Sequence, residues 1–130
     1  MVAPVTPKPI TNSKADNSLM KWIDLVSFNQ LDDIVSLSAD KPVVIFKHST
    51  RCNVSSIALT RLLKAGPVNE TPFYFLDLIS HRQLSGLIAE KFQVSHESPQ
   101  LLLIKNGECV YEESHLGINA GELLEQIKAN

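Results

Sequence analysis

The chain carries two cysteines, and one of them, Cys52, stands where a thiol can be chemically active. It follows an apolar run at residues 43–46 and a short polar segment, and it precedes a stretch whose apolar residues recur at helical spacing. Cys52 is therefore predicted at the first turn of a helix, where free backbone N–H groups and the helix dipole favour an anion. A thiolate is such an anion, and it is the form of cysteine that attacks disulfides.

The neighbours of Cys52 could support this chemistry. Arg51 adds a positive charge next to the sulfur, and His48 could donate or accept a proton or only stack over the loop. Thr50 could cap the helix, but Asn53 then occupies the third helical position, which Glu or Gln fills in a capping box. Some N–H donors are therefore predicted to stay free for the sulfur. The alternative is a small buried cysteine at a strand–helix junction.

Ser55 occupies the position of the second cysteine in a Cys-x-x-Cys motif. One helical turn brings its hydroxyl within reach of the Cys52 sulfur, to which it could donate a hydrogen bond. Since a hydroxyl cannot form a disulfide, the dithiol mechanism through this pair is excluded. A monothiol cycle remains, in which Cys52 forms a mixed disulfide with an outside thiol. Alternatively, Ser55 is a small polar residue on a helix surface.

Ser98 and Pro99 stand just before the apolar run at residues 101–104, separated from it by Gln100. Proline is tolerated at the first residue of a strand. A cis bond between the two residues would expose backbone groups beside the cysteine, whereas a trans bond is the more common form.

The second cysteine, Cys109, is predicted on the same strand face as Tyr111, as a half-buried apolar side chain. The order of elements leaves open whether it approaches Cys52 to within the Cα distance of about 7 Å that a disulfide needs. A metal site built from His48, Cys52 and His96 is disfavoured because the spacing is irregular.

Helix starts can be predicted from a repeated local pattern, in which Ser or Asn is followed three residues later by Gln or Glu between apolar residues. The pattern occurs at Ser27 with Gln30, Ser80 with Gln83, and Asn119 with Glu122. Helices are therefore predicted to begin near residues 28, 81 and 120. A fourth helix is predicted over residues 52–65, where Gly66 and Pro67 end it.

Apolar runs at residues 43–46, 73–76 and 101–104 do not alternate with polar residues, which predicts central strands covered by helices on both faces. An Asn-Gly turn signal predicts a hairpin into residues 108–114, and a weaker strand is predicted over 22–26. The resulting β-α-β-α-β-α-β-β-α order predicts a three-layer α/β/α domain of thioredoxin-like type with a mixed sheet. The crossovers predict parallel pairing, and the hairpin adds an antiparallel edge.

Composition limits the remaining classes. The 130 residues fit one domain over 20–130, preceded by a flexible proline-containing tail over 1–19. A net charge of −2 disfavours nucleic-acid binding, and no apolar stretch is long enough to span a membrane or to act as a signal peptide. With only two cysteines, we expect a cytoplasmic protein in a reducing compartment.

The runs at residues 42–52 and 97–100 resemble the monothiol bacilliredoxin family, the thioredoxin-like general stress proteins of the bacillithiol system. The run at 105–117 is also similar, and the match covers roughly residues 20–128. The resemblance implies a single redox cysteine at Cys52 and a cis proline at Pro99. It also implies reduction of mixed disulfides between proteins and a low-molecular-weight thiol such as bacillithiol. That thiol acts as co-substrate, and no cofactor is bound.

Two positions depart from the expected pattern. The family usually has proline directly after the cysteine, whereas this chain has Asn53, which restores a backbone donor near the sulfur. Thioredoxins proper keep a buried carboxylate six residues before the nucleophile, and Phe46 stands there instead. Proton transfer through such a carboxylate is therefore not expected.

Three functions are compatible with the sequence. The favoured one is a monothiol thiol–disulfide oxidoreductase, a monomer or weak dimer whose partners are S-thiolated proteins and a small-thiol or protein reductant. The second is an iron–sulfur carrier of the monothiol glutaredoxin kind, although its Cys-Gly-Phe-Ser motif and double glycine are missing. The third is a thioredoxin-fold binding or stress module without redox activity.

Overall fold

The structure, a computed structural model, describes residues 22–64 and 71–130. Its elements, in chain order, are β1 (Trp22–Asp24), α1 (Asn29–Leu37), β2 (Val43–His48), α2 (Asn53–Lys64), β3 (Phe73–Asp77), α3 (Arg82–Phe92), β4 (Gln100–Lys105), β5 (Glu108–Ser114), the 3₁₀ turn η1 (His115–Gly117) and α4 (Ala120–Ala129). This is the predicted order, while the predicted tail at residues 1–19 lies outside the described residues. No helix among the described residues is long and apolar enough to cross a membrane.

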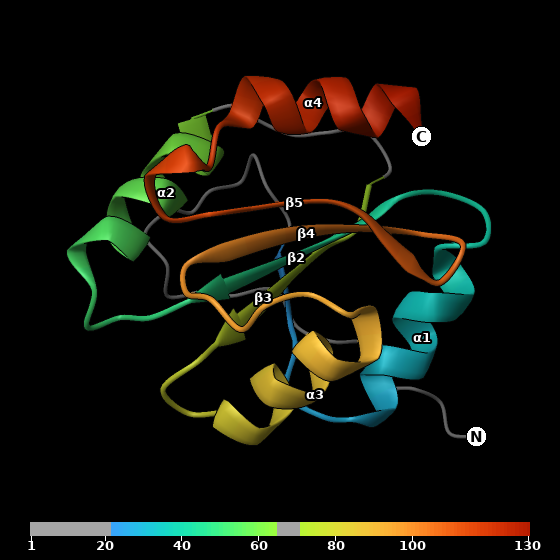
Figure 1. Cartoon of the computed structure of the whole chain (residues 1–130), viewed down its shortest axis with the longest axis horizontal. Helices are drawn as coiled ribbons and strands as arrows, with labels where there is room; N and C mark the ends of the chain where they lie inside the picture. Colours follow the sequence, from blue (N-terminus) through green and yellow to red (C-terminus); the bar gives the residue numbers. More distant parts are fainter. Residues whose placement is uncertain (1–21, 65–70) are drawn as a thin grey trace.

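The five strands form one mixed sheet in the order β1-β3-β2-β4-β5. Helices α2 and α4 cover one face of the sheet, and α1 and α3 cover the other (Figure 1). The predicted three-layer α/β/α architecture is therefore confirmed. Strand β2 lies at the centre. Its residues 43–46 are buried, as their uninterrupted apolar run predicted, and Lys47 and His48 are buried as well.

The direction of β4 corrects one prediction. The parallel pairs are β1 with β3 and β3 with β2, but β4 runs antiparallel to β2 although a helical crossover precedes it. After α3, residues 93–99 carry the chain back to the end of the sheet where β2 finishes, so that Gln100 pairs with Lys47. The start of β4 therefore lies beside the end of β2, which is the end that leads to Cys52.

The predicted helix starts were confirmed to different extents. At α4, the side chain of Asn119 accepts a hydrogen bond from the Glu122 N–H at 2.8 Å, as predicted. At α1, Gln30 Oε1 accepts from the Ser27 N–H at 3.0 Å, which is half of the predicted box, and the helix begins at Asn29.

The predicted cap at α3 is wrong, because the Ser80 hydroxyl is hydrogen-bonded to the Asp77 carboxylate and not to the helix. Ser80 Oγ donates to Asp77 Oδ2 at 3.1 Å, and Asp77 Oδ1 accepts from the Ile79 N–H at 3.0 Å. The first helical residue is consequently Arg82, one position later than predicted.

A β-bulge in β5 corrects the predicted orientation of Cys109. Leu103 pairs with Tyr111 and Ile104 pairs with Cys109, so the intervening residue Val110 is the extra one. The bulge breaks the alternation along the strand. Cys109 therefore packs on the α1/α3 face and Tyr111 on the α2/α4 face.

Candidate active site

Cys52 lies directly before α2, where the sequence placed it. Its N–H donates to the Ser49 carbonyl at 3.1 Å, which closes the turn after β2, and its own carbonyl accepts from the Ser56 N–H at 3.2 Å. Cys52 is half-buried, and Thr50, Arg51 and Asn53 beside it are exposed. The thiol thus stands at the N-terminal end of α2 with access from solvent.

Ser55 lies one turn into α2 and is fully buried. Its Oγ accepts from the Ser49 N–H at 3.0 Å and lies 2.6 Å from His48 Nδ1. Burial lowers the pKa of the His48 imidazole, against a smaller opposing effect of the Asp77 carboxylate. The Ser55 hydroxyl thus joins His48 to the turn. Among the described residues, the predicted hydrogen bond from Ser55 to the Cys52 sulfur is not present.

Aromatic rings surround His48 beneath the turn. Its ring stacks on Phe46 at a centroid distance of 6.0 Å and tilts against Phe75 at 5.3 Å. Phe46 itself is fully buried and also contacts Trp22. The position that carries a carboxylate in thioredoxins is therefore part of an apolar aromatic cluster, as its residue type predicted.

The loop that carries Ser98 and Pro99 lies at the same end of the sheet as Cys52. Gln100 pairs with Lys47, so continuing that register places Pro99 beside His48. The Ser98–Pro99 peptide bond is cis, as the family resemblance implied. The Pro99 carbonyl accepts from the His115 N–H at 3.0 Å, and the buried Ser98 Oγ has no hydrogen-bond partner among the described residues.

Cys109 is not placed to act as a resolving cysteine for Cys52. It lies opposite Ile104, which pairs with Val43 at the start of β2, whereas Cys52 follows the end of β2. The six residues of β2 span roughly 16 Å, and Cys109 also faces the opposite side of the sheet from α2. Burial raises the pKa of the Cys109 thiol, which donates to the Tyr111 carbonyl at 3.3 Å.

One buried residue near the site, Lys47, was missed by the sequence analysis. It is fully buried, and its Nζ donates to the Ser85 carbonyl at 3.3 Å. Its burial could have been predicted from the sequence, because Lys47 lies two positions after Ile45 in the same strand and both side chains therefore point to the same face of the sheet. His96, considered above as a metal ligand, lies 3.5 Å from Ser85 Oγ. Among the described residues, no three His, Cys, Asp or Glu side chains are grouped to hold a metal ion.

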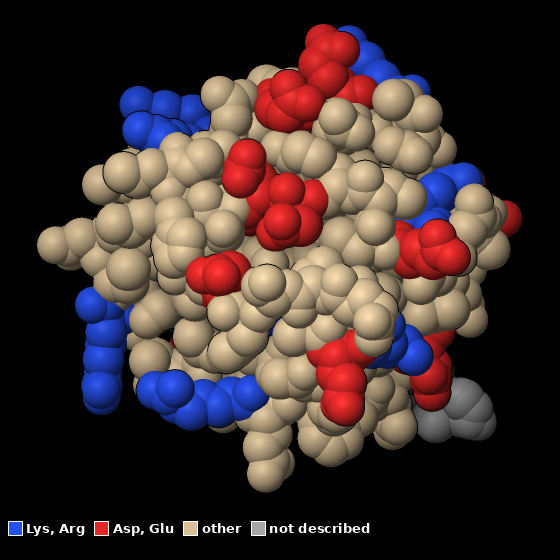
Figure 2. Space-filling model, viewed as in Figure 1, with Lys and Arg blue, Asp and Glu red and all other residues tan. Residues whose placement is uncertain are grey.

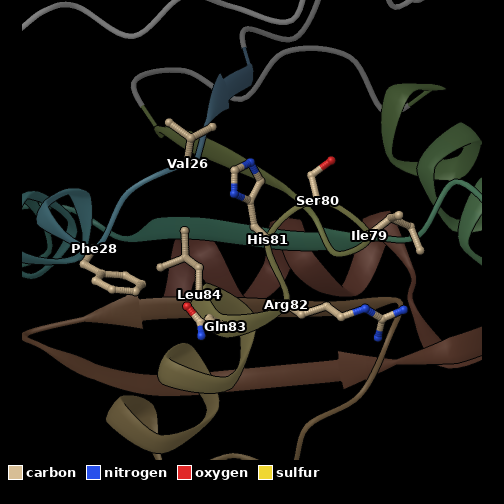
Figure 3. A pocket seen from close by; sticks show the side chains of 8 residues that line it. All are labelled: Val26, Phe28, Ile79, Ser80, His81, Arg82, Gln83 and Leu84. Atoms are coloured by element: carbon tan, nitrogen blue, oxygen red, sulfur yellow. The ribbon is translucent and has the colours of Figure 1, made fainter.

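Two features mark the surface: carboxylates gather over β5 (Figure 1, Figure 2), and a pocket lies at the end of the sheet where β1 and β3 finish. On the face shown in Figure 2, carboxylates lie over the middle, where β5 runs in Figure 1, and Lys and Arg side chains lie toward the margins. A pocket of about 400 Å³ lies where β1 and β3 end (Figure 3). Ile79, one of its lining residues, follows Leu78, whose N–H donates to the His48 carbonyl at 2.8 Å. The pocket is thus next to the segment that leads to Cys52.

A mixed thioredoxin-type sheet, one accessible cysteine at the start of α2 and an adjacent cis-proline loop together define a thiol oxidoreductase of thioredoxin-like fold. The sequence model for monothiol bacilliredoxin BrxC matches residues 23–123. The chain therefore belongs to the monothiol bacilliredoxin family.

Solved structures agree with this assignment. A protein described as a proposed oxidoreductase with a thioredoxin fold is 32% identical, with 82% of this chain and 93% of that chain covered and a TM-score of 0.68. Schistosoma mansoni thioredoxin is 22% identical, with coverage of 84% and 94% and a TM-score of 0.64. Malassezia sympodialis thioredoxin is 18% identical, with coverage of 98% and 96% and a TM-score of 0.62. The last two comparisons establish the fold alone.

Proposed function

We propose that this protein is a monothiol oxidoreductase that uses Cys52 to remove a low-molecular-weight thiol of the bacillithiol type from mixed disulfides with proteins. The observation that carries the proposal is the accessible Cys52 at the start of α2, with buried Ser55 in the place of a second cysteine. Family membership supports the same chemistry.

The reaction takes two thiol–disulfide exchange steps. In the first, the Cys52 thiolate attacks the small-thiol sulfur of the mixed disulfide. A disulfide forms between Cys52 and the small thiol, the original disulfide breaks, and the protein thiolate leaves and takes a proton from water. In the second, another small-thiol thiolate attacks the small-thiol sulfur held on Cys52. The oxidised small-thiol disulfide leaves and Cys52 is restored, so the two electrons come from the small thiol; a protein reductase could supply them instead.

The residues around Cys52 have separate roles in this scheme. Cys52 stands at the N-terminal end of α2, the end of a helix that favours an anion, and Arg51 beside it is exposed and carries a positive charge. The turn that holds the thiol is fixed from below by Ser55 and His48. Backbone groups next to Ser98 and Pro99, together with exposed Thr50 and Asn53, form the surface that meets the substrate. We further propose that the protein acts in a reducing cytoplasm on S-thiolated proteins, without a bound cofactor.

The test uses a model protein carrying one bacillithiol mixed disulfide. The full chain should release the protein thiol and gain the mass of one bacillithiol on Cys52, and Cys52→Ser should abolish both. The matched control is Cys109→Ser, which should react as the unaltered chain does. The same substrate carrying glutathione identifies the preferred thiol.

Absence of an adduct on Cys52, or unchanged release by the Cys52→Ser variant, would contradict the proposal. A folded chain with an unreactive Cys52 that still binds partner proteins would instead indicate the binding module. Iron–sulfur binding would show as visible absorption in the purified protein.

A further inference from the structure

Lys47 is a buried cation on the side of the sheet away from the thiol. It is 0% exposed, and its position in β2 places it on the α1/α3 face, whereas the neighbouring His48 lies under α2. An apolar side chain of similar volume at such a position is generally as stable or more stable. Stability alone therefore does not account for a lysine here.

The polar groups around Lys47 come from three segments: Ser85 on α3, Glu97 in the loop before β4, and Gln100 at the start of β4. Of the three donors of its ammonium group, one reaches the Ser85 carbonyl. Gln100, its direct partner on β4, has a buried Oε1 with no hydrogen-bond partner among the described residues. The Glu97 carboxylate attracts the charge of Lys47. Lys47 and Gln100 thus occupy paired positions on one face of the sheet, where the Gln100 Oε1 is unpaired, and Glu97 and Gln100 flank Ser98 and Pro99.

The same loop is connected at almost every position. Gln100 Nε2 donates to the Ser95 carbonyl and to Glu112 Oε1, both at 3.1 Å. Glu97 Oε1 lies 2.9 Å from His115 Nε2. Lys47 reaches this loop through two neighbours. Ser85, whose carbonyl accepts from Lys47 Nζ, has its Oγ 3.5 Å from His96 Nδ1, and Gln100, the β4 partner of Lys47, donates to the Ser95 carbonyl.

The link to the thiol is short. The Lys47–Gln100 pair is the last pair of the β2–β4 ladder. Beyond this pair, β2 continues through His48 to Cys52, and β4 is preceded by Pro99. A displacement at this pair therefore changes the position of the loop relative to the thiol.

We propose that Lys47 is a positioning residue, which holds the loop at residues 95–99 in the place that disulfide exchange at Cys52 requires. The role rests on the function proposed above. It acts through the sheet, since Lys47 faces away from the substrate side.

Titration offers a readout that a purely structural role would not produce. Burial lowers the pKa of the Lys47 amine to about 8, with the Glu97 carboxylate acting in the opposite direction. The charged or titratable groups around it are Glu97 and His96 from the loop and Glu112 from β5, reached through Gln100. As the pH rises through about 8, Lys47 loses the charge that attracts Glu97, and the loop loses part of its attachment.

The experiment compares two rates in the full chain between pH 6.5 and 9.5. One is exchange with the protein–bacillithiol disulfide, which needs the loop, and the other is alkylation of Cys52 by iodoacetamide, which needs only the thiolate. In the unaltered chain, the ratio of exchange to alkylation should fall as the pH rises through about 8. Lys47→Met should lower the ratio at all pH values by about tenfold. Lys47→Arg, which keeps its charge, should restore it and remove the pH dependence.

Three further variants and measurements make the outcome decisive. Should Lys47→Met fail to fold, Glu97→Gln must lower the ratio, with Glu90→Gln on the exposed side of α3 as the matched control. A ratio that Lys47→Met leaves unchanged, or that Lys47→Arg does not restore, would overturn the proposal. A chain that alkylates but never exchanges would refute the proposed function instead. In that case Lys47→Met must still speed amide hydrogen exchange at residues 95–98. Unchanged rates of amide hydrogen exchange at these residues would overturn the positioning role.

Discussion

Ser55→Ala is the substitution that most directly tests the arrangement beneath the thiol. The change removes one buried oxygen that serves two partners, the Ser49 N–H at 3.0 Å and His48 Nδ1 at 2.6 Å. Because Ser55 is fully buried, water cannot replace either hydrogen bond without entering the site.

The magnitude follows from these two contacts. A buried N–H left without an acceptor costs about 1–3 kcal/mol, and loss of the bond to the neutral imidazole costs about 0.5–1.5 kcal/mol. Alanine has the better helix propensity, which returns about 0.5 kcal/mol. The free energy of unfolding should therefore fall by about 1–4 kcal/mol, which corresponds to a melting temperature lower by roughly 4–15 °C.

Urea unfolding gives the measurement, with an unchanged m-value showing that only stability has changed. The matched control is Ser56→Ala, the next residue along α2, whose side chain is exposed and which should change stability by less than about 0.5 kcal/mol. Equal effects of the two substitutions would refute the role assigned to Ser55.

The same variant separates structure from chemistry. Because the Ser55 hydroxyl is hydrogen-bonded to His48 and to the Ser49 N–H, Ser55→Ala should leave the alkylation rate of Cys52 within about threefold at temperatures where the variant is folded. A tenfold loss of reactivity in the folded variant would mean that the hydroxyl acts on the sulfur after all.

Three other perturbations have defined outcomes. Burial lowers the pKa of His48, so the unfolded chain binds the proton more readily than the folded chain. The free energy of unfolding should therefore fall as the pH drops through about 6.5. Urea titrations of His48→Gln should show a smaller dependence on pH. The pKa of Lys47 is lowered to about 8, so between that value and about 10.4 the unfolded chain binds more protons and the free energy of unfolding should rise with pH. Lys47→Met should lack this rise and should be more stable than the unaltered chain at pH 7, although its disulfide exchange is slower. A variant that is less stable at pH 7 would contradict the destabilising effect of the buried charge. Asn119→Ala removes the cap on α4 and should cost about 1 kcal/mol by thermal melting, against a change of less than about 0.5 kcal/mol for Asn29→Ala, an exposed residue at the start of α1.

Features set by residues close in sequence were predicted well. The position of Cys52 follows from a strand-length apolar run, a short polar segment and a helical pattern, all within about twenty residues. The cap at Asn119 depends on a residue three positions away. The local pattern failed at Ser80 because another nearby side chain binds its hydroxyl. Ser80 Oγ donates to the Asp77 carboxylate and does not cap α3.

The chemistry of the candidate site was predicted in outline but not in its contacts. The sequence supplied a single thiol at position 52 and a serine where a dithiol motif needs its second cysteine. It could not supply the partner of Ser55, because the hydroxyl has several acceptors within reach of a helical turn. Burial of His48 between aromatic rings from two different strands decided in favour of the imidazole.

The sequence by itself determined the order of the elements, the single thiol at a helix start and the family of the protein, because each depends on local spacing or on runs of matching residues. Tertiary structure alone decided the direction of β4, the face occupied by Cys109 and the burial of Lys47 against Gln100. These three features depend on strand register between distant segments. One extra residue in β5 reverses which side of the sheet a side chain meets, and a return segment before β4 reverses the strand.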